Sequence, residues 1–460
     1  MAKAKTRQRG ENFMTAYVQD MTKGNVTAHL IRFAVPMLFG NLFQQVYNIV
    51  NSIVVGKHIG DTALAGVGIV TSLNFLFFSI CLGLSVGIGV VIAHYFGAGR
   101  EDGVKKAIGN SIYIIVGIGV LMSVLGVVFA RPILLFLDTP SDAMPYALEY
   151  MQILSAGVIF VAGYNGISAI LRALGDAKTP LIFLVISSLI NAGLDILFVM
   201  EWEMGVGGAA LATVIAQAVA MFGSIIFAVK VNPYMHLQKK HFAVDKKMIK
   251  KSLKIGIPMS IQYSLIAVSI IILQKVVNGF GTVTLAAYTA TVRVEQLINQ
   301  PFNSMGAAMS TFTGQNMGQG NVKRVRSSFR KSVKMIVGFS IVSCIVFFVA
   351  GEWIMKCFIS NPEAIAMGAK GLRITSLFYI ALGLIYTTRG MLNGAGDTSY
   401  ALVNGMMEMI GRVVFSLIFI RIPAVGVWGL WITTGMTWLI TGGSGVWRYL
   451  QGKWAKIQIE

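Results

Sequence analysis

The chain has 460 residues, of which 55% are hydrophobic and 12% are charged, and its mean hydropathy is +0.71. Soluble domains carry about 25% charged residues, so this composition excludes a set of ordinary globular domains and predicts a polytopic membrane protein. The formal net charge of +19 does not indicate nucleic-acid binding, because the basic residues cluster in short gaps between apolar runs. We therefore expect the lipid bilayer as the surroundings of the chain and no nucleic-acid partner.

Twelve apolar runs are each long enough to cross the hydrocarbon core of a bilayer, so they predict twelve transmembrane helices. The first six are expected near 33–56, 64–95, 109–130, 146–170, 180–200 and 207–229. The second six are expected near 255–278, 285–315, 333–351, 371–391, 400–420 and 425–447. The predicted fold class is therefore an all-α polytopic membrane protein.

Most of the 38 basic residues fall in one set of loops, which predicts that these loops and both termini are cytoplasmic. The N-terminus lacks a short apolar core with a small-residue cleavage site, so we expect no signal peptide and a multi-pass protein of the cell membrane. The expected divisions are a basic N-terminal segment (1–32), a first bundle (33–229), a basic linker (230–254), a second bundle (255–447) and a tail (448–460). The linker holds eight lysines and could form a basic helix on anionic lipid or a solvated tether.

The two halves of the chain match each other at a shift of 221 or 222 positions. Matching positions include Pro36 with Pro258, Gly175 with Gly396 and Asp176 with Asp397. Each half holds six predicted spans, an even number, so both halves would enter the membrane from the same side. The sequence therefore predicts two six-helix bundles related by a pseudo-two-fold axis along the membrane normal, which is a transporter architecture.

The predicted span at 180–200 contains three polar residues at helical spacing, Ser188, Asn191 and Asp195. Steps of three and four place them on one helix face. A carboxylate at this depth costs about 2.5–3.5 kcal/mol on insertion scales, which makes Asp195 a candidate functional residue. The first half supplies no fixed cation at this depth, so we expect a mobile partner: a proton, a sodium ion or a cationic substrate. The alternative is a structural aspartate satisfied by amides and water.

Polar stripes on three other spans would suit the wall of a water-filled cavity. The candidate substrate-cavity residues are Gln44, Asn48, Asn74, Glu295 and Asn299. Glu295 corresponds to Asn74 under the repeat. For any single amide the alternative is a hydrogen bond between helices, typically worth about 0.6 kcal/mol.

Glu408 and Arg412 are four residues apart with the acid nearer the N-terminus, which is the favourable order for a helical ion pair. Arg412 stands where the first half has Asn191. Arg293, Glu295, Glu408 and Arg412 can neutralise one another within the second half. We therefore predict that Glu408 and Arg412 form a structural or gating charge pair.

No motif predicts an enzyme or an ATP-driven pump. The chain has no GxxxxGK[ST] phosphate loop, no HExxH and no metal-site spacing of Cys and His. The GAGD at 394–397 resembles the GxGD of intramembrane proteases, but its repeat copy, ALGD at 173–176, also lies in an inner turn. We assign both to turn formation, and expect no catalytic residue and no cofactor.

Several short motifs resemble those of the multidrug and toxic-compound extrusion (MATE) transporters. They are QQVYNIVN at 44–51, ALAGVG at 63–68, FGAG at 96–99, RALGD at 172–176 and GQNMG at 314–318. The similarity runs from about Leu30 to Arg448, and it is nearest to the bacterial DNA-damage-inducible-F-like branch. It implies two six-helix bundles that face each other in a V, and efflux of organic cations in exchange for sodium or protons.

The resemblance also implies where the coupling ion binds. In that branch the first bundle uses an acid on span one together with an Asn and an Asp on span five. Asn191 and Asp195 match the span-five pair, whereas Asn51 stands where the span-one acid is expected. Coupling would then rest on Asp195 alone, and oxygens of Asn51, Asn191 and Ser188 could complete a sodium site around it.

These observations together predict a monomeric secondary transporter that exports amphipathic organic cations by alternating access. The main alternative is a lipid-linked oligosaccharide flippase of related fold. Such a flippase should present a basic central cavity to a pyrophosphate, whereas the unpaired charge in this sequence is acidic. An ion channel is disfavoured, because two bundle repeats with a single midplane acid indicate occluded exchange.

Overall fold

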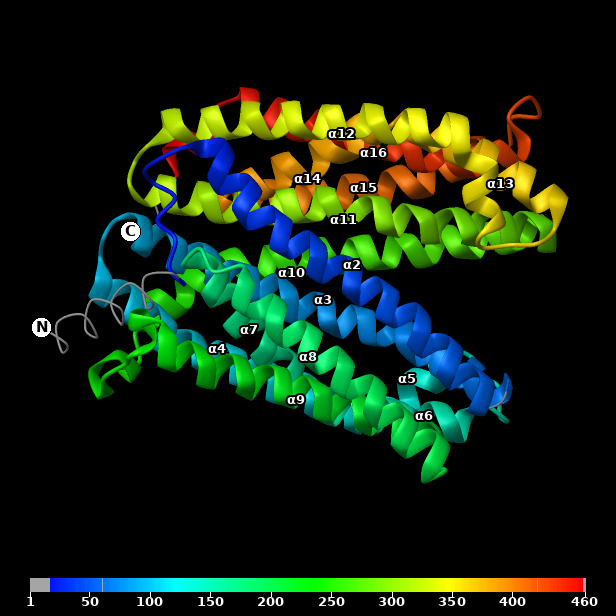
Figure 1. Cartoon of the computed structure of the whole chain (residues 1–460), viewed down its shortest axis with the longest axis horizontal. Helices are drawn as coiled ribbons and strands as arrows, with labels where there is room; N and C mark the ends of the chain where they lie inside the picture. Colours follow the sequence, from blue (N-terminus) through cyan, green and yellow to red (C-terminus); the bar gives the residue numbers. More distant parts are fainter. Residues whose placement is uncertain (1–16, 60, 420, 458–460) are drawn as a thin grey trace, which may run out of the picture. The chain divides into compact units, whose positions relative to one another are not determined.

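The computed structural model describes residues 17–59, 61–419 and 421–457, and these residues form helices joined by short loops (Figure 1). The elements in the first half are α2 (Val26–Ile59), α3 (Asp61–Gly97), α4 (Glu101–Val128), α5 (Ala130–Phe136), α6 (Met144–Ala156), α7 (Val158–Ala173), α8 (Lys178–Asp195), the π-helix η1 (Ile196–Glu201) and α9 (Gly205–Val231). Two 3₁₀ turns follow, η2 (Pro233–Met235) and η3 (Lys239–Phe242). The second half has α10 (Lys246–Val277), η4 (Asn278–Phe280), α11 (Thr282–Gly318), α12 (Val322–Lys356), α13 (Pro362–Ser376), α14 (Tyr379–Gly394), α15 (Thr398–Phe419), η5 (Gly426–Trp428), α16 (Gly429–Leu450) and η6 (Lys453–Lys456).

Among the described residues, eight helices are long and apolar enough to cross a membrane, or ten if each of two bent pairs counts as one span. The bent pairs are α6 with α7, at 44°, and α13 with α14, at 53°. α11 and α16 stand at two further predicted spans but are not among the ten. Both are continuous helices, but amide, threonine or glycine residues interrupt their apolar sequence and lower its hydropathy. The chain is thus an all-helical, multi-pass membrane protein.

The described contacts divide the chain into two compact units. Unit 1 takes residues up to 21 and 39–260, and unit 2 takes 22–38 and 261 onward. This division differs from the sequence-based one in two places: the start of α2 groups with unit 2, and the linker 230–254 groups with unit 1. Pro36 lies inside α2, two residues before the last residue of the helix that groups with unit 2. A proline at such a position removes a backbone hydrogen bond and bends the helix.

The linker is not the free tether that was one of its two expected forms, and its last nine residues, with five of its eight lysines, form the start of a helix. It makes two 3₁₀ turns that pack on α4, and α10 then begins at Lys246. Asn110 on α4 donates to the carbonyl of Ala243 (3.2 Å) and accepts from the backbone N–H of Asp245 (2.8 Å). His241 is buried, and Lys240 pairs with Asp102 at 3.1 Å. Side chains of α4 therefore hold the linker in place.

Small residues allow the helices within each unit to approach closely. In unit 2, α11 packs on α14, and a Cβ at Gly390 would overlap the carbonyl oxygen of Gly306. In unit 1, α3 packs on α7, and a Cβ at Gly89 would lie 3.2 Å from the carbonyl oxygen of Ala169. Such contacts are expected where helices associate by close packing in a bilayer.

Candidate functional site

The three polar residues of α8 lie on a buried face of unit 1. Asp195 is 1% exposed, and Asn191 and Ser188 are each 6% exposed. The Ser188 hydroxyl donates to the carbonyl of Leu184 (2.9 Å). The neighbouring Leu189 is 60% exposed, so the apolar side of the helix is the exposed one. Ser188, Asn191 and Asp195 therefore share one buried face of α8, as their spacing predicts.

Asp195 is the last α-helical residue before a change of backbone winding. α8 ends at Asp195 and continues directly as the π-helix Ile196–Glu201. The N–H of Ile196 is shared between the carbonyls of Ala192 and Gly193. π-helical turns are rare and are frequently found at functional sites. The change of backbone winding therefore occurs directly after Asp195, the residue that the sequence predicts to be functional.

A tyrosine from another helix accompanies the carboxylate. Tyr150 on α6 interacts electrostatically with Asp195 and packs against Val199 of the π-helix. Sequence reasoning missed Tyr150, because its partner lies 45 positions away and no repeat pairs the two helices. The buried setting of Asp195 therefore combines residues of α6 and α8.

The residues predicted to line a substrate cavity are distributed unevenly. Asn48 and Asn51 belong to α2, but their side chains lie outside the described residues. Gln44 and Asn74 are half-buried in unit 1. Asn299 is half-buried on α11, and its amide donates to the backbone carbonyl of Glu295 (2.8 Å). The contribution of Asn51 to the cation site therefore stays a prediction.

Unit 2 contains a buried ion cluster centred on Glu408. Its Oε1 accepts from Arg412 at 3.0 Å, and this is the i,i+4 pair that the spacing predicts. Its Oε2 accepts from Arg389 of α14 at 2.8 Å. Arg412 also donates to the hydroxyl of Ser269 on α10 (2.8 Å). All three charged side chains are at least nine-tenths buried, so the cluster is part of the interior of unit 2.

Neutral side chains extend this cluster. Arg389 also donates to the Oδ1 of Asn404 (2.9 Å), which accepts a second hydrogen bond from Gln262 (2.8 Å). The amide of Asn404 donates to the hydroxyl of Tyr400 (2.9 Å). The network therefore ties α10, α14 and α15 together through a single carboxylate, Glu408, and its two arginines.

The buried charges of unit 2 differ from the sequence-based set by one arginine. Arg293 was expected in the cluster, but it is exposed on α11. Arg389 takes that place, and its pairing with Glu408 was not among the sequence-based predictions. Glu295 is 9% exposed and lies beside Arg412, so it belongs to the interior of unit 2 and does not share the exposed face of α11.

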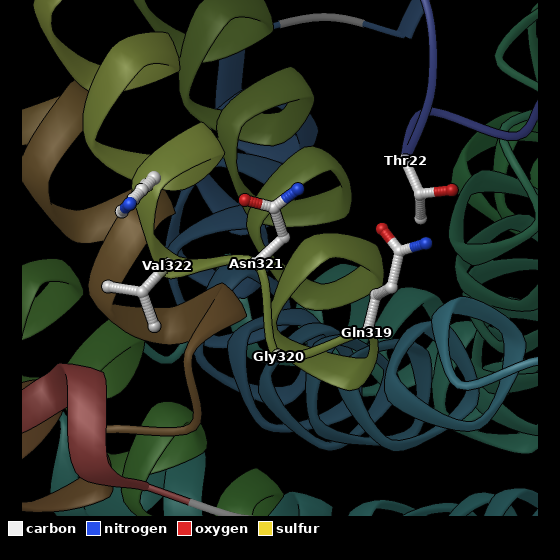
Figure 2. Close-up of a pocket in the computed structure, with 6 residues that line it drawn as sticks. Thr22, Gln319, Gly320, Asn321 and Val322 are labelled. Carbon is white, nitrogen blue, oxygen red and sulfur yellow. The ribbon is translucent and has the colours of Figure 1, made fainter.

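A pocket of about 580 Å³ lies at the turn between α11 and α12 (Figure 2). Gln319, Gly320 and Asn321 line it, and Gly320 has a positive φ of 76°. The Asn321 side chain accepts from the backbone N–H of Arg324 (3.1 Å) and so caps α12. These residues build a polar turn, and the pocket contains none of the buried charges described above.

The model of the family MatE matches residues 36–197 and again residues 258–418. Two matches to one model, offset by the same shift as the sequence repeat, show that the halves are two copies of one unit. The chain is 28% identical over 449 residues to the probable multidrug resistance protein YpnP of Bacillus subtilis, covering 97% of this chain and 99% of that one. It is 24% identical over 436 residues to the probable multidrug resistance protein NorM of Thermotoga maritima, covering 94% of each.

A solved structure with the same fold is a transporter of the MOP superfamily from Pyrococcus furiosus, described as having a binding pocket of reverse polarity that suggests a different function. It superposes with a TM-score of 0.88 over 95% of this chain and 98% of that chain, at 23% identity. At that identity the likeness concerns the fold alone. The family assignment rests on the sequence model, which covers well over half of the residues. The chain therefore belongs to the MatE family.

Proposed function

We propose that this protein is a secondary multidrug efflux transporter, which exports amphipathic organic cations in exchange for protons or sodium by alternating access. The observation that carries the proposal is the buried Asp195, which shares an inward face with Asn191 and Ser188 where α8 becomes a π-helix. The names of the relatives YpnP and NorM as probable multidrug resistance proteins support it.

The chemistry of the site suits ion coupling. A charged carboxylate is costly in a buried, weakly polar setting, so a bound proton or sodium ion lowers that cost. The amide oxygen of Asn191 and the hydroxyl of Ser188 are neutral oxygen ligands of the kind that a hard cation accepts. A cation at Asp195 drives transport only if it binds one of the two alternating states better than the other.

The proposal includes an arrangement in the membrane. We propose twelve spans in two six-helix bundles related by a pseudo-two-fold axis along the membrane normal, with both termini cytoplasmic and a monomeric protein. The repeat and the distribution of basic residues support this arrangement. The Asn191 and Asp195 pair supports a place in the DNA-damage-inducible-F-like branch.

A lipid-linked oligosaccharide flippase is the second candidate, and one observation favours it. Arg293 is exposed on α11, where a phosphate-bearing substrate would find a cation. The buried arginines of unit 2, Arg389 and Arg412, do not strengthen this case, because both are paired with Glu408 in the interior. Efflux of organic cations therefore remains the better supported function.

The deciding experiment measures efflux of a fluorescent organic cation from proteoliposomes under an imposed proton or sodium gradient. Wild type should transport against the dye gradient, and Asp195→Asn should lose gradient-driven efflux while remaining folded, because a neutral amide is cheaper than a carboxylate at this depth. Asp176→Asn is the matched control, since it makes the same change at the other end of α8. The control should keep its efflux within about twofold, because Asp176 lies before the start of α8, away from the coupling residue, and an asparagine there keeps the capping oxygen.

Full gradient-driven efflux by Asp195→Asn would contradict the assignment of the coupling residue. Absence of dye efflux in wild type under both gradients, together with translocation of a lipid-linked oligosaccharide, would favour the flippase. A comparison of the two gradients also identifies the coupling ion.

A further inference from the structure

One face of α11 is both exposed and polar. Its exposed residues after the first turn are Thr289, Arg293, Gln296 and Asn303. Steps of four, three and seven place them on one stripe. Polar and charged side chains at membrane depth face water or protein rather than lipid, so we expect this stripe to be turned away from lipid. Arg293 is the only charged side chain on it among the described residues.

The corresponding stripe on α3 has a different character. Under the repeat, the four stripe positions of α11 correspond to Gly68, Ser72, Phe75 and Leu82. Phe75 is 49% exposed in unit 1. The polar stripe is therefore specific to the second repeat, and the shared fold does not require it.

Arg293 lines a pocket of about 340 Å³ within unit 2. Leu285, Ala286, Phe358 and Ile359 supply most of the apolar wall. Phe358 and Ile359 follow the C-terminal end of α12, and Arg293 lies about 16 Å along α11 from its start. The guanidinium thus stands at the polar edge of an apolar pocket.

Within the part of the chain that the structure describes, no carboxylate lies within ion-pair distance of Arg293. Its near neighbour in sequence, Glu295, points into the interior of unit 2 beside Arg412. An arginine favours planar, bidentate oxyanions as hydrogen-bond partners. An apolar wall beside such a cation suits a ligand that is apolar along its body and anionic at one end.

We propose that Arg293 and the pocket beside it form a binding subsite for the carboxylate or phosphate of an amphipathic molecule. The anion comes either from a transported molecule or from the headgroup of an acidic lipid. For a transported molecule, the inference rests on the proposed function and assigns the anionic end of that molecule to Arg293.

The test compares two dyes that share a cationic ring system. Rhodamine B carries a free carboxylate, and rhodamine 6G carries an ethyl ester at the same position. Binding is measured by fluorescence anisotropy with the full chain in phosphatidylcholine nanodiscs. Arg293→Gln should weaken rhodamine B binding about tenfold, the typical loss of a charge-assisted hydrogen bond, and should leave rhodamine 6G within about twofold. Arg293→Lys should recover part of the loss, because a lysine keeps the charge without the planar fork.

A second arm detects the lipid source. Preference for phosphatidylglycerol over phosphatidylcholine is measured by lipid retained on the purified protein from mixed vesicles. If the anion is a headgroup, Arg293→Gln should reduce that preference severalfold while the two dyes respond alike. Lys370→Gln is the matched control for loss of one exposed positive charge in unit 2, and it should change neither readout.

An unchanged dye discrimination together with an unchanged lipid preference in Arg293→Gln would overturn the subsite. Equal weakening by Lys370→Gln would also overturn it, because the effect would then be one of overall charge. Neither binding readout requires an ion gradient. A failure of gradient-driven efflux in wild type would therefore count against the proposed function and leave the subsite to be judged by binding.

Discussion

The two repeats place different chemistry at the same pair of positions. In α8 of unit 1 these positions hold Asn191 and Asp195, and in α15 of unit 2 they hold Arg412 and Ser416. All four side chains are buried. Unit 2 thus carries a fixed cation where unit 1 carries an amide, and a hydroxyl where unit 1 carries an acid.

The backbone differs at the same place. α8 changes to a π-helix directly after Asp195, whereas α15 continues as an α-helix past Ser416 to Phe419. In unit 2 the cation pairs with Glu408 inside a network of three helices. At these equivalent positions, unit 2 therefore holds a buried ion cluster, whereas unit 1 holds a buried acid directly before a π-helix.

The largest expected effect breaks the permanent cluster of unit 2. Glu408→Gln leaves Arg389 and Arg412 buried without their shared carboxylate, and removal of one partner from a buried ion pair costs about 3–5 kcal/mol. We expect poor expression and a strongly lowered Tm in detergent, measured by fluorescence-detected size-exclusion chromatography and thermal unfolding. Asp195→Asn, the carboxyl-to-amide change in the other repeat, should remain folded in the same assay.

Arg412→Gln sharpens this prediction, because Glu408 keeps its ion pair with Arg389. The loss of stability should therefore be smaller than in Glu408→Gln, and combining the two substitutions should recover part of the Glu408→Gln loss. A Glu408→Gln variant as stable as wild type would show that the cluster is not structural.

A smaller effect is expected at the turn that the two repeats share. Both oxygens of Asp397 accept from Arg448, at 2.7 and 3.0 Å. Asp397→Asn weakens a charge-assisted pair, so the free energy of unfolding should fall by about 1–3 kcal/mol. Arg448→Gln should give a loss of similar size in thermal unfolding. If the repeat counterpart Asp176→Asn lowered stability as much, the turn rather than the ion pair would account for the effect.

The smallest effect concerns Asp176 and its pH dependence. Its Oδ1 accepts from the backbone N–H groups of Lys178 and Thr179 (2.9 Å each), while burial raises the pKa of the carboxyl above its usual range. A raised pKa in the folded state means that stability is lost as the pH rises through that pKa, and that the penalty is absent below the unfolded value of about 3.9. Asp176→Asn keeps the capping oxygen without the charge.

The Tm of Asp176→Asn should therefore exceed that of wild type by about 1–3 °C at pH 7, and the difference should vanish near pH 4. Thermal unfolding at the two pH values measures both. A gain of the same size at pH 4 would show that charge burial is not its cause. The pairing of Asp397 with Arg448 predicts no such gain for Asp397→Asn.

Local patterns in the sequence predict those parts of the site that lie on one helix. The spacing of Ser188, Asn191 and Asp195 predicts one face, and the four-residue step from Glu408 to Arg412 predicts their ion pair. Both predictions need only the helical period, because the residues share an element. The lengths of the apolar runs predict the helical class, and the positions that match at a constant shift predict the repeat.

Features that depend on contacts between elements could not be predicted in this way. Arg389 reaches Glu408 from α14, and Tyr150 reaches the neighbourhood of Asp195 from α6. The packing of the first part of the linker on α4 could not be predicted, because its lysines dominate its composition, whereas Asn110 and Asp102 on α4 hold its backbone and its 3₁₀ turn. The direction of Arg293 and Glu295 likewise depends on the rotation of α11 in the packed unit.

The bend within the fourth predicted span has a consequence for the history of the chain. α6 and α7 meet at a bend after Ala156, and α13 and α14 meet at a bend after Ser376, which are equivalent points of the two repeats. A break acquired twice at one position would need two independent events, whereas a break already present before the gene duplicated needs one. The bent span thus belongs to an ancestor half this length, while the acid of one copy and the arginine of the other record what happened after the copies parted.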